Sequence, residues 1–296
     1  MIDLMVQPKF WNPETSGERL LLMLVRNSVE LRVLAETLNG LGPAAQHSAL
    51  RLGRRFADLS SFFVGASVLH LQQRMIRLSQ DAREKHPYDR DAALKVTRER
   101  VCDVLSFTPL DYEGDFGVLV EEVLTSAEQL GKEPSAPLKQ RVARAGPPHC
   151  YSCGRMFGTI HADAPGPDGL KPTADHVWPI ALGGDTIEAN LLPACAPCNS
   201  RKGHIATWQM AWLQPVVFSD TDQTTALPGL PVPIKMALHM RAAMNYATAN
   251  GASLRDAFLA IGPRDTPARI DQDQGYDFFN LRVHDELRTN VLWRPR

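Results

Sequence analysis

Four cysteines arranged in two pairs constrain this chain more than any other feature of its sequence. Cys150 and Cys153 form one C-x-x-C pair, Cys195 and Cys198 form a second, and 41 residues lie between the pairs. Two residues between cysteines let a tight turn present both thiolates to one ion, and two such pairs complete a tetrahedral sulfur shell for zinc. A closed four-sulfur shell leaves no position for water, so we predict a structural zinc ion, with the 41 residues inserted between its two halves.

Other uses of these cysteines have less support. A redox C-x-x-C needs a strand–helix context of the thioredoxin type, which the sequence around both pairs lacks. Five cysteines in 296 residues are too few for a disulfide scaffold, and a chain of this length does not need one. Cys102 stands apart on the apolar face of a predicted helix, where we interpret it as a core residue.

Cellular location follows from the absence of targeting patterns. Residues 1–12 show no basic stretch followed by an apolar stretch, as a signal peptide would. The most apolar runs, 20–25 and 62–71, are well short of the roughly 20 residues that span a bilayer. We therefore expect a cytoplasmic protein without membrane contact, in a compartment where paired cysteines hold metal.

Composition changes along the chain divide it into three predicted regions. Residues 1–145 read as a helical N-terminal domain, and residues 146–212, rich in Gly, Pro, Cys, His and Asp, as a small α+β domain. Residues 213–296 read as a connector followed by a helical region. The predicted fold class is thus mainly α with a small central α+β domain.

Apolar spacing and capping residues locate the helices. Residues 15–18, with the sequence Thr-Ser-Gly-Glu, fit a capping box ahead of a first helix, in which leucines recur at helical spacing up to position 38. Residues 133–137 read as a linker. The further predicted helices cover residues 44–85, ended by Pro87, and residues 90–105, 116–130, 234–249 and 253–261.

Charge argues against a cationic tail that wraps nucleic acid. The chain holds 32 basic and 33 acidic side chains, and residues 146–210 alone hold 4 and 5. Arginines cluster at positions 51, 54 and 55 and again at 74, 77 and 83. These clusters fit a solvated helix face or, as the less favoured alternative, a stripe that contacts phosphates.

The segment between and after the cysteine pairs carries further motifs. A D-H-x-x-P string occupies residues 175–179, Gly-Gly 183–184, Asn-Leu 190–191, and C-x-x-C-N-x-x-K 195–202. This ordered series closely resembles the HNH endonucleases, whose shared fold is the ββα-metal motif. The resemblance covers about 60 residues, and it implies that the small domain is a nuclease domain stapled by zinc.

The resemblance also implies a role for each motif residue. His176 would be the general base, and Asp175 and Asn199 would supply oxygen ligands to a catalytic Mg²⁺ or Mn²⁺ ion. Asn190 would brace the loop that carries His176, and Lys202 is a candidate phosphate contact, although a solvated lysine is almost as well supported. A neutral imidazole suits the base because its ordinary pKa lies near working pH.

One base and one catalytic metal ion imply cleavage of one strand per site. Cutting both strands would then require a homodimer or two sequential nicks. The leading hypothesis is a DNA endonuclease or nickase, and the near-neutral charge predicts weak binding without a protein partner or second subunit.

Two alternatives stay open: a zinc-stapled nucleic-acid-binding module that does not cleave, and an enzyme that cleaves RNA. The N-terminal helices would dock a partner, sense a signal or cover the active site. Such arrangements resemble those of prokaryotic restriction and anti-phage defence systems.

Overall fold

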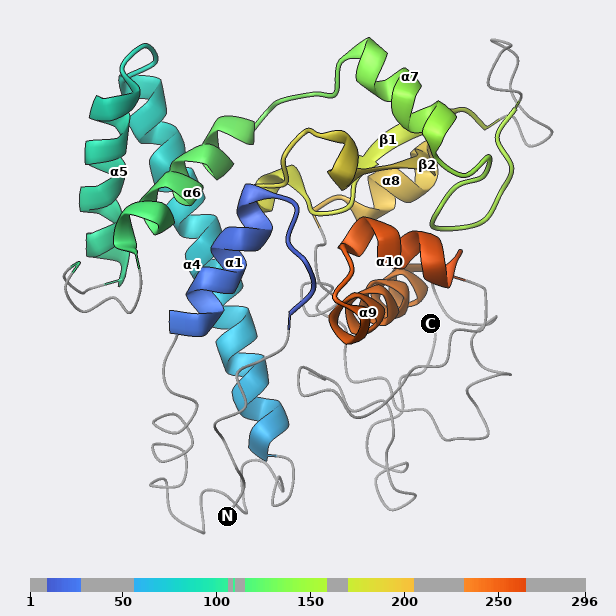
Figure 1. Ribbon diagram of the computed structural model, residues 1–296, viewed down its shortest axis with the longest axis horizontal. Coiled ribbons are helices and arrows are strands. Elements are labelled where there is room, and N and C mark those ends of the chain that lie inside the picture. The colour runs from blue at the N-terminus through green and yellow to red at the C-terminus, as the bar shows by residue number, and fades with distance from the viewer. Residues whose placement is uncertain are drawn as a thin grey trace.

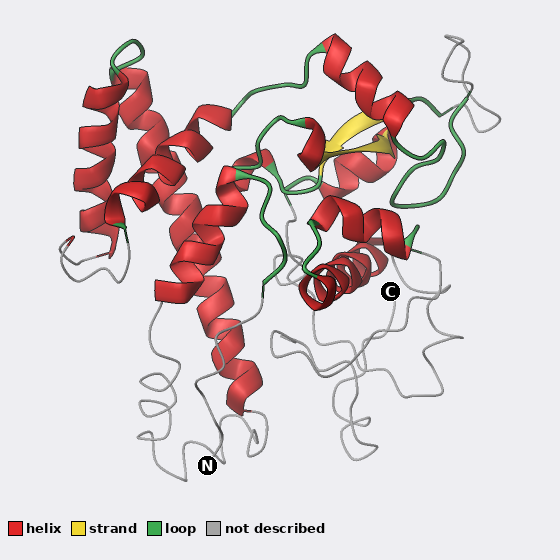
Figure 2. Cartoon of the chain, viewed as in Figure 1, coloured by secondary structure: helices red, strands yellow, loops and turns green. Residues whose placement is uncertain are grey.

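The protein is mainly helical, with one small sheet in its central segment (Figure 2). The computed structural model describes residues 10–27, 56–105, 109, 115–158, 170–204 and 232–264. Two antiparallel strands and a following helix in the central segment confirm the predicted fold class. Within these ranges, no helix combines the length and apolar character that crossing a bilayer requires.

Four helices gather on one side of the molecule (Figure 1). They are α1 (Ser16–Asn27), α4 (Phe56–Lys85), α5 (Arg90–Leu105) and α6 (Phe116–Gln129). The predicted ends at Lys85, before Pro87, and at Leu105 are confirmed. Residues 28–55, which include the later leucines of the first predicted helix and the start of the second, lie outside the described residues.

The predicted capping box at the start of α1 is confirmed. The backbone N–H and the hydroxyl of Thr15 donate to Glu18 Oε2 at 2.9 and 2.8 Å, and the N–H of Glu18 donates to Thr15 Oγ1 at 3.2 Å. Trp11 Nε1 donates to Glu18 Oε1 at 2.8 Å. Burial raises the pKa of Glu18, and the hydrogen bonds from Thr15 and Trp11 counteract that rise.

The prediction of a linker over residues 133–137 was wrong at its end, because helix α7 (Ala136–Ala145) begins there. Ser135 is the N-cap, and its hydroxyl accepts from the N–H of Leu138 at 3.4 Å. Pro137 stands in the first turn, where the missing N–H costs nothing. A proline that reads as a loop signal in isolation therefore opens a helix here.

The central segment forms a ββα unit. Strand β1 (Pro172–His176) pairs antiparallel with β2 (Leu191–Cys195), and helix α8 (Ala196–Lys202) follows directly. Short 3-10 turns, η2 (Ile180–Leu182) and η3 (Glu188–Asn190), lie in the connection between the strands.

The two faces of this sheet are covered by different helices. Leu138 and Val142 of α7 pack against Leu191 and Ala174 on one face. Because side chains alternate along a strand, Thr173 and Asp175 lie on the other face, where residues of α8 contact them. His176 therefore lies on the α7 face and Asp175 on the α8 face, as expected for adjacent strand residues.

Two C-terminal helices pack beside the ββα unit, α9 (Val232–Asn250) and α10 (Leu254–Ile261). Both correspond to predicted helices, and Ser253 caps α10 by accepting from the N–H of Asp256 at 3.1 Å. Residues 213–231 of the predicted connector and residues 265–296 lie outside the described residues.

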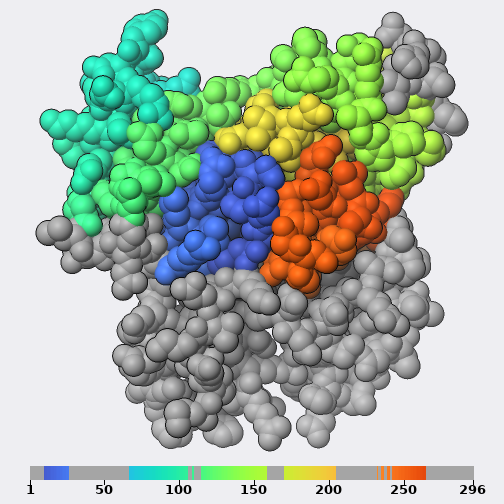
Figure 3. Space-filling view, in the orientation of Figure 1, coloured from blue at the N-terminus to red at the C-terminus, as the bar shows by residue number. Residues whose placement is uncertain are grey.

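One hydrophobic core joins the three predicted regions. It contains Leu20 of α1, Leu119 of α6, Trp178 of the central segment and Phe258 of α10. Figure 3 shows the surface of the N-terminal segment, in blue, directly against that of α9 and α10, in orange, and the backbone N–H of Asn12 donates to the carbonyl of Ala252 at 2.9 Å. The boundaries 1–145, 146–212 and 213–296 remain a prediction, and the core runs across them.

Candidate metal centre and active site

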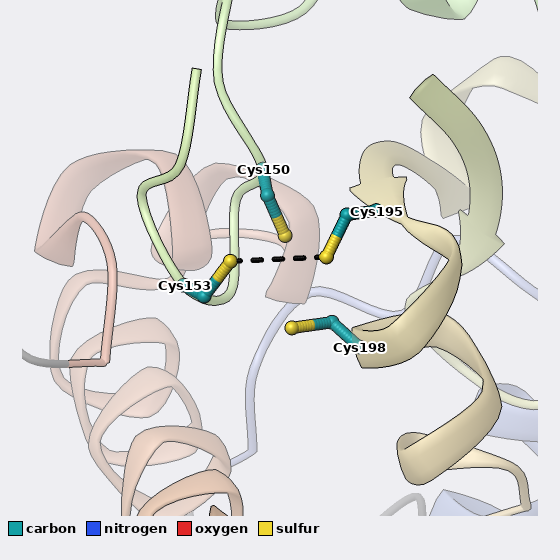
Figure 4. A group of neighbouring side chains, drawn as sticks. All are labelled: Cys150, Cys153, Cys195 and Cys198. Atoms are coloured by element: carbon teal, nitrogen blue, oxygen red, sulfur yellow. Dashed lines mark hydrogen bonds between the residues drawn. The ribbon is translucent and has the colours of Figure 1, made fainter. Parts of the chain in front are cut away.

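The four predicted cysteine ligands come together in one cluster (Figure 4). Their Sγ atoms all lie within 4.8 Å of one another, and Cys153 Sγ and Cys195 Sγ are 3.8 Å apart. A tetrahedral zinc ion with Zn–S bonds of about 2.3 Å separates neighbouring sulfurs by about 3.8 Å. All four cysteines are free thiols. The residues therefore fit a zinc ion held by four sulfurs.

Two arginines lie against the cysteine sulfurs. Arg264, just after α10, donates through Nη1 to Cys198 Sγ at 3.3 Å and to Ser152 Oγ at 2.9 Å. Arg155 Nη2 lies 3.9 Å from Cys195 Sγ. A hydrogen bond from Cys150 and then the one from Arg264 lower the pKa of Cys198 to about 4. The hydrogen bond with Cys198 raises the pKa of Cys150, and burial raises that of Cys195, so Cys198 is the sulfur for which these surroundings favour the thiolate, the form that binds metal.

Asp175 is buried between two hydrogen-bond donors. The hydroxyl of Tyr151 donates to its Oδ2 at 2.7 Å, and Lys202 Nζ donates to its Oδ1 at 3.1 Å. Burial raises the pKa of Asp175, and the charge of Lys202 and the hydrogen bond from Tyr151 lower it again. Burial and the charge of Asp175 raise the pKa of Tyr151, so this hydroxyl stays protonated and donates.

Lys202 is also buried, with its ammonium turned toward β1. Besides Asp175, Nζ contacts the backbone carbonyl of His176. The structure therefore places Lys202 in an internal ion pair, where its charge supports β1 and is withdrawn from the solvent. The predicted phosphate contact of Lys202 stays a prediction.

Asn199 lies half-buried on α8, next to the cysteine cluster. Its Nδ2 donates to Thr173 Oγ1 at 3.1 Å and lies 3.5 Å from the carbonyl of Ala174. Because the amide nitrogen makes these contacts, Oδ1 is the atom that could bind a cation. Asn199 and Asp175 thus come from packed elements on one side of the sheet, and both offer the oxygen ligands that Mg²⁺ prefers.

His176 lies at the end of β1 with its ring partly buried. Its Nε2 is 3.1 Å from Thr186 Oγ1. Burial and the positive charge of Lys202 lower the pKa of His176 to about 4. The imidazole is therefore neutral at pH 7, which is the state that a general base requires.

Asn190 connects both ends of the loop that follows His176. Its Oδ1 accepts from the N–H of Trp178 at 2.7 Å, and its Nδ2 donates to the carbonyls of Trp178 and Asp185, each at 3.0 Å. The carbonyl of Asn190 accepts from the N–H of Val177 at 2.8 Å. These four bonds fix the backbone immediately after the predicted base.

The N-terminal helices contact the same loop through polar groups. Ser16 Oγ donates to Asp185 Oδ1 at 2.7 Å, and the N–H of Ser16 donates to Asp185 Oδ2 at 3.0 Å. Gln72 Nε2, in α4, donates to the carbonyls of Gly17 and Leu182 at 2.7 and 2.9 Å. The loop is therefore held from outside the ββα unit as well as from within.

Three residues of this site have no counterpart among the sequence predictions. Tyr151 stands inside the first C-x-x-C pair, and its partner lies 24 residues away. Thr186 and Arg264 belong to no motif, so only the folded structure identifies them. The sequence signal that could have identified Tyr151 is its position directly beside a predicted metal ligand, Cys150.

A two-stranded antiparallel sheet and a following helix, with four cysteines placed to hold a metal ion and a histidine at the end of β1, define a ββα domain. Residues 150–204 match the family model of the HNH endonucleases. The chain therefore contains an HNH endonuclease domain, as its motifs predicted, and such a domain acts in general on nucleic acid. The comparisons with curated proteins and with solved structures gave no match.

Proposed function

We propose that this protein is a metal-dependent endonuclease or nickase that hydrolyses DNA phosphodiester bonds. The observation that carries the proposal is the HNH match over residues 150–204, together with a neutral, anchored His176 at the end of β1. A base that stays neutral at physiological pH and is fixed by a hydrogen bond suits deprotonation of water.

In this proposal each side chain has one task. His176 accepts the proton of the attacking water, and Asp175 and Asn199 hold the catalytic cation through oxygen atoms. Tyr151 and Lys202 occupy two of the roughly four lone-pair sites of the Asp175 carboxylate, which leaves acceptor capacity for a cation. Bound Mg²⁺ or Mn²⁺ would supply positive charge to the scissile phosphate.

Affinity for DNA would come from outside the nuclease centre. The central segment, residues 146–210, holds 4 basic and 5 acidic side chains, and the predicted phosphate contact Lys202 is buried. We therefore propose a nuclease that binds DNA weakly until a partner or a second copy supplies contacts. Such dependence suits an effector of a restriction or anti-phage system.

Plasmid relaxation by the full-length, zinc-loaded protein tests this proposal. Supercoiled DNA should become nicked with Mg²⁺ or Mn²⁺ and stay intact without a divalent ion. His176→Ala should reduce the rate by about 100-fold or more, since general bases contribute 10²–10⁴. Asn199→Ala should raise the Mg²⁺ requirement. His70→Ala, on the exposed side of α4, is the matched control and should cut as the wild type does.

The alternatives give different outcomes in the same assay. A protein that binds DNA but leaves it intact at all metal concentrations would be a binding module. Cleavage of RNA with intact matched DNA would identify the RNA-cleaving alternative. Intact supercoiled, single-stranded and RNA substrates would overturn the proposal for this chain alone.

A further inference from the structure

Thr186 lies between the predicted base and the end of helix α6. Its Oγ1 is 3.1 Å from His176 Nε2 and donates to the backbone carbonyl of Lys132 at 3.3 Å. Its backbone N–H lies 3.5 Å from Gln129 Oε1. A side chain of the nuclease loop is thus tied to the helical region that precedes the nuclease domain.

One arrangement of protons satisfies both contacts of Thr186 Oγ1. The carbonyl of Lys132 can only accept, and in this arrangement the single hydroxyl proton of Thr186 points to it. Oγ1 then has only lone pairs to offer to His176, and Nε2 is the donor. A neutral imidazole carries one N–H, which leaves the lone pair on Nδ1.

We infer that Thr186 is a positioning residue that fixes the tautomer of His176, with Nε2 protonated and Nδ1 as the proton acceptor. The inference rests on the proposed function of His176. When Nδ1 accepts the proton of water, the ring becomes an imidazolium with two N–H groups. Thr186 Oγ1 continues to accept from Nε2, so the bond strengthens as positive charge develops on the ring.

The helical region supplies the fixed acceptor for the Thr186 hydroxyl, the backbone carbonyl of Lys132. After α6 the chain turns at Gly131, where φ is +77°, and the N–H of Lys132 donates to the carbonyl of Gln129 at 2.9 Å. This turn places the carbonyl of Lys132 beside Thr186. Residues 129–132 therefore support the catalytic centre. This role differs from the predicted one of covering the active site.

Histidine NMR on the full-length, zinc-loaded protein tests the inference without relying on activity. The ¹⁵N shifts of both ring nitrogens identify the tautomer, and His176→Gln assigns the signal among the nine histidines. The wild type should show His176 protonated at Nε2. Thr186→Val removes the hydroxyl at nearly constant shape and should give a mixture of tautomers, while Thr186→Ser should restore the wild-type spectrum.

Cleavage rates provide the second readout. Thr186→Val should lower the rate about 10- to 100-fold at saturating Mg²⁺, the range typical of residues that orient a functional group, and Thr186→Ser should recover most of it. Thr125→Val, which removes a hydroxyl on the bundle side of α6, is the control and should change neither tautomer nor rate.

A wild-type His176 protonated at Nδ1 would overturn the inference. So would an unchanged tautomer and rate in Thr186→Val. If the wild type cleaves no nucleic acid yet shows the Nε2–H tautomer and loses it in Thr186→Val, the proposed function fails and the positioning role stands. The wild-type spectrum decides the question even if Thr186→Val does not fold.

Discussion

Lys202 and Asp175 form an ion pair that is almost fully withdrawn from water. Their side chains are 2% and 5% exposed, and Nζ lies 3.1 Å from Oδ1. Moving both charges out of water is costly, so such a pair adds little net stability, whereas removing one partner leaves the other charge buried alone. The three-residue spacing of Asn199 and Lys202 predicted neither the burial of the Lys202 ammonium nor its pairing with Asp175.

Lys202→Met tests the role of this ammonium. It should lower the free energy of unfolding by about 3–5 kcal/mol, because Asp175 would lose its only described cationic partner in a buried position. Urea unfolding of the zinc-loaded protein measures the change. Lys139→Met removes an exposed lysine of α7 and should cost less than about 1 kcal/mol. Unchanged stability with weaker DNA binding would instead support the predicted phosphate contact.

The depressed pKa of His176 predicts an unusual pH dependence. A histidine with its ordinary pKa of about 6.5 would lose half of its neutral form by pH 6.5. Because burial and Lys202 lower the pKa of His176 to about 4, the neutral base should persist down to about pH 5 and decline only near pH 4. Initial rates of Mg²⁺-dependent nicking between pH 4 and 8 measure this. A midpoint near pH 6.5 would contradict the prediction.

At the scale of elements, the C-terminal helices contribute to the zinc site. Arg264 follows α10 and contacts both cysteine pairs, through Ser152 inside the first pair and Cys198 in the second. Four thiolates around Zn²⁺ carry a net charge of −2, so a guanidinium donor beside one sulfur reduces their repulsion. The helices α9 and α10 thereby position a charge for a metal site that lies outside them.

Arg264→Gln should weaken zinc binding about 10- to 100-fold, the range found when outer partners of metal ligands are removed. Competition with a chromophoric zinc chelator measures this directly. Arg201→Gln, at an exposed position on α8 close to Cys198, removes an arginine without such a contact and should bind zinc as the wild type does. Equal chelator curves for Arg264→Gln and wild type would show that the contact has no effect on the metal.

The sequence predicted correctly those parts of the fold that depend on local chemistry. Thr15 and Ser253 cap helices through neighbouring residues, and each cysteine pair is a local turn, so the two pairs could be predicted to share one ion. Thr186 and Arg264 were not predicted, because tertiary packing brings them to partners that are 54 and 66 residues away in the sequence. The start of α7 was missed although Ser135 gave a capping signal, since the adjacent prolines suggested a loop.

At the scale of the whole molecule, α1 packs tightly against the nuclease loop at Gly17. A Cβ atom there would collide with the carbonyl of Leu182, and it would lie 2.7 Å from Trp178 Nε1. The N–H of Gly17 donates to the carbonyl of Gly183 at 2.9 Å. Only glycine lets α1 lie this close to the loop, so the shared core depends on this position.

Gly17→Ala should therefore disturb the nuclease domain from a helix outside it. We expect a loss of about 1–3 kcal/mol, the usual cost of overpacking, and faster zinc release, because the loop and the cysteine cluster share one core with α1. Urea unfolding followed by tryptophan fluorescence, to which buried Trp178 contributes, and by zinc release measures both effects. The two probes should give coincident transitions in the wild type.

Gly117→Ala is the matched control, because Gly117 also lies in the first turn of a helix but is exposed. Alanine there should be neutral or slightly stabilising, since it has the higher helix propensity. Separate transitions for fluorescence and zinc release, with zinc release unaffected by Gly17→Ala, would mean that the nuclease domain folds independently of the N-terminal helices. Coincident transitions that shift together would mean that the N-terminal helices and the nuclease domain unfold as one cooperative unit.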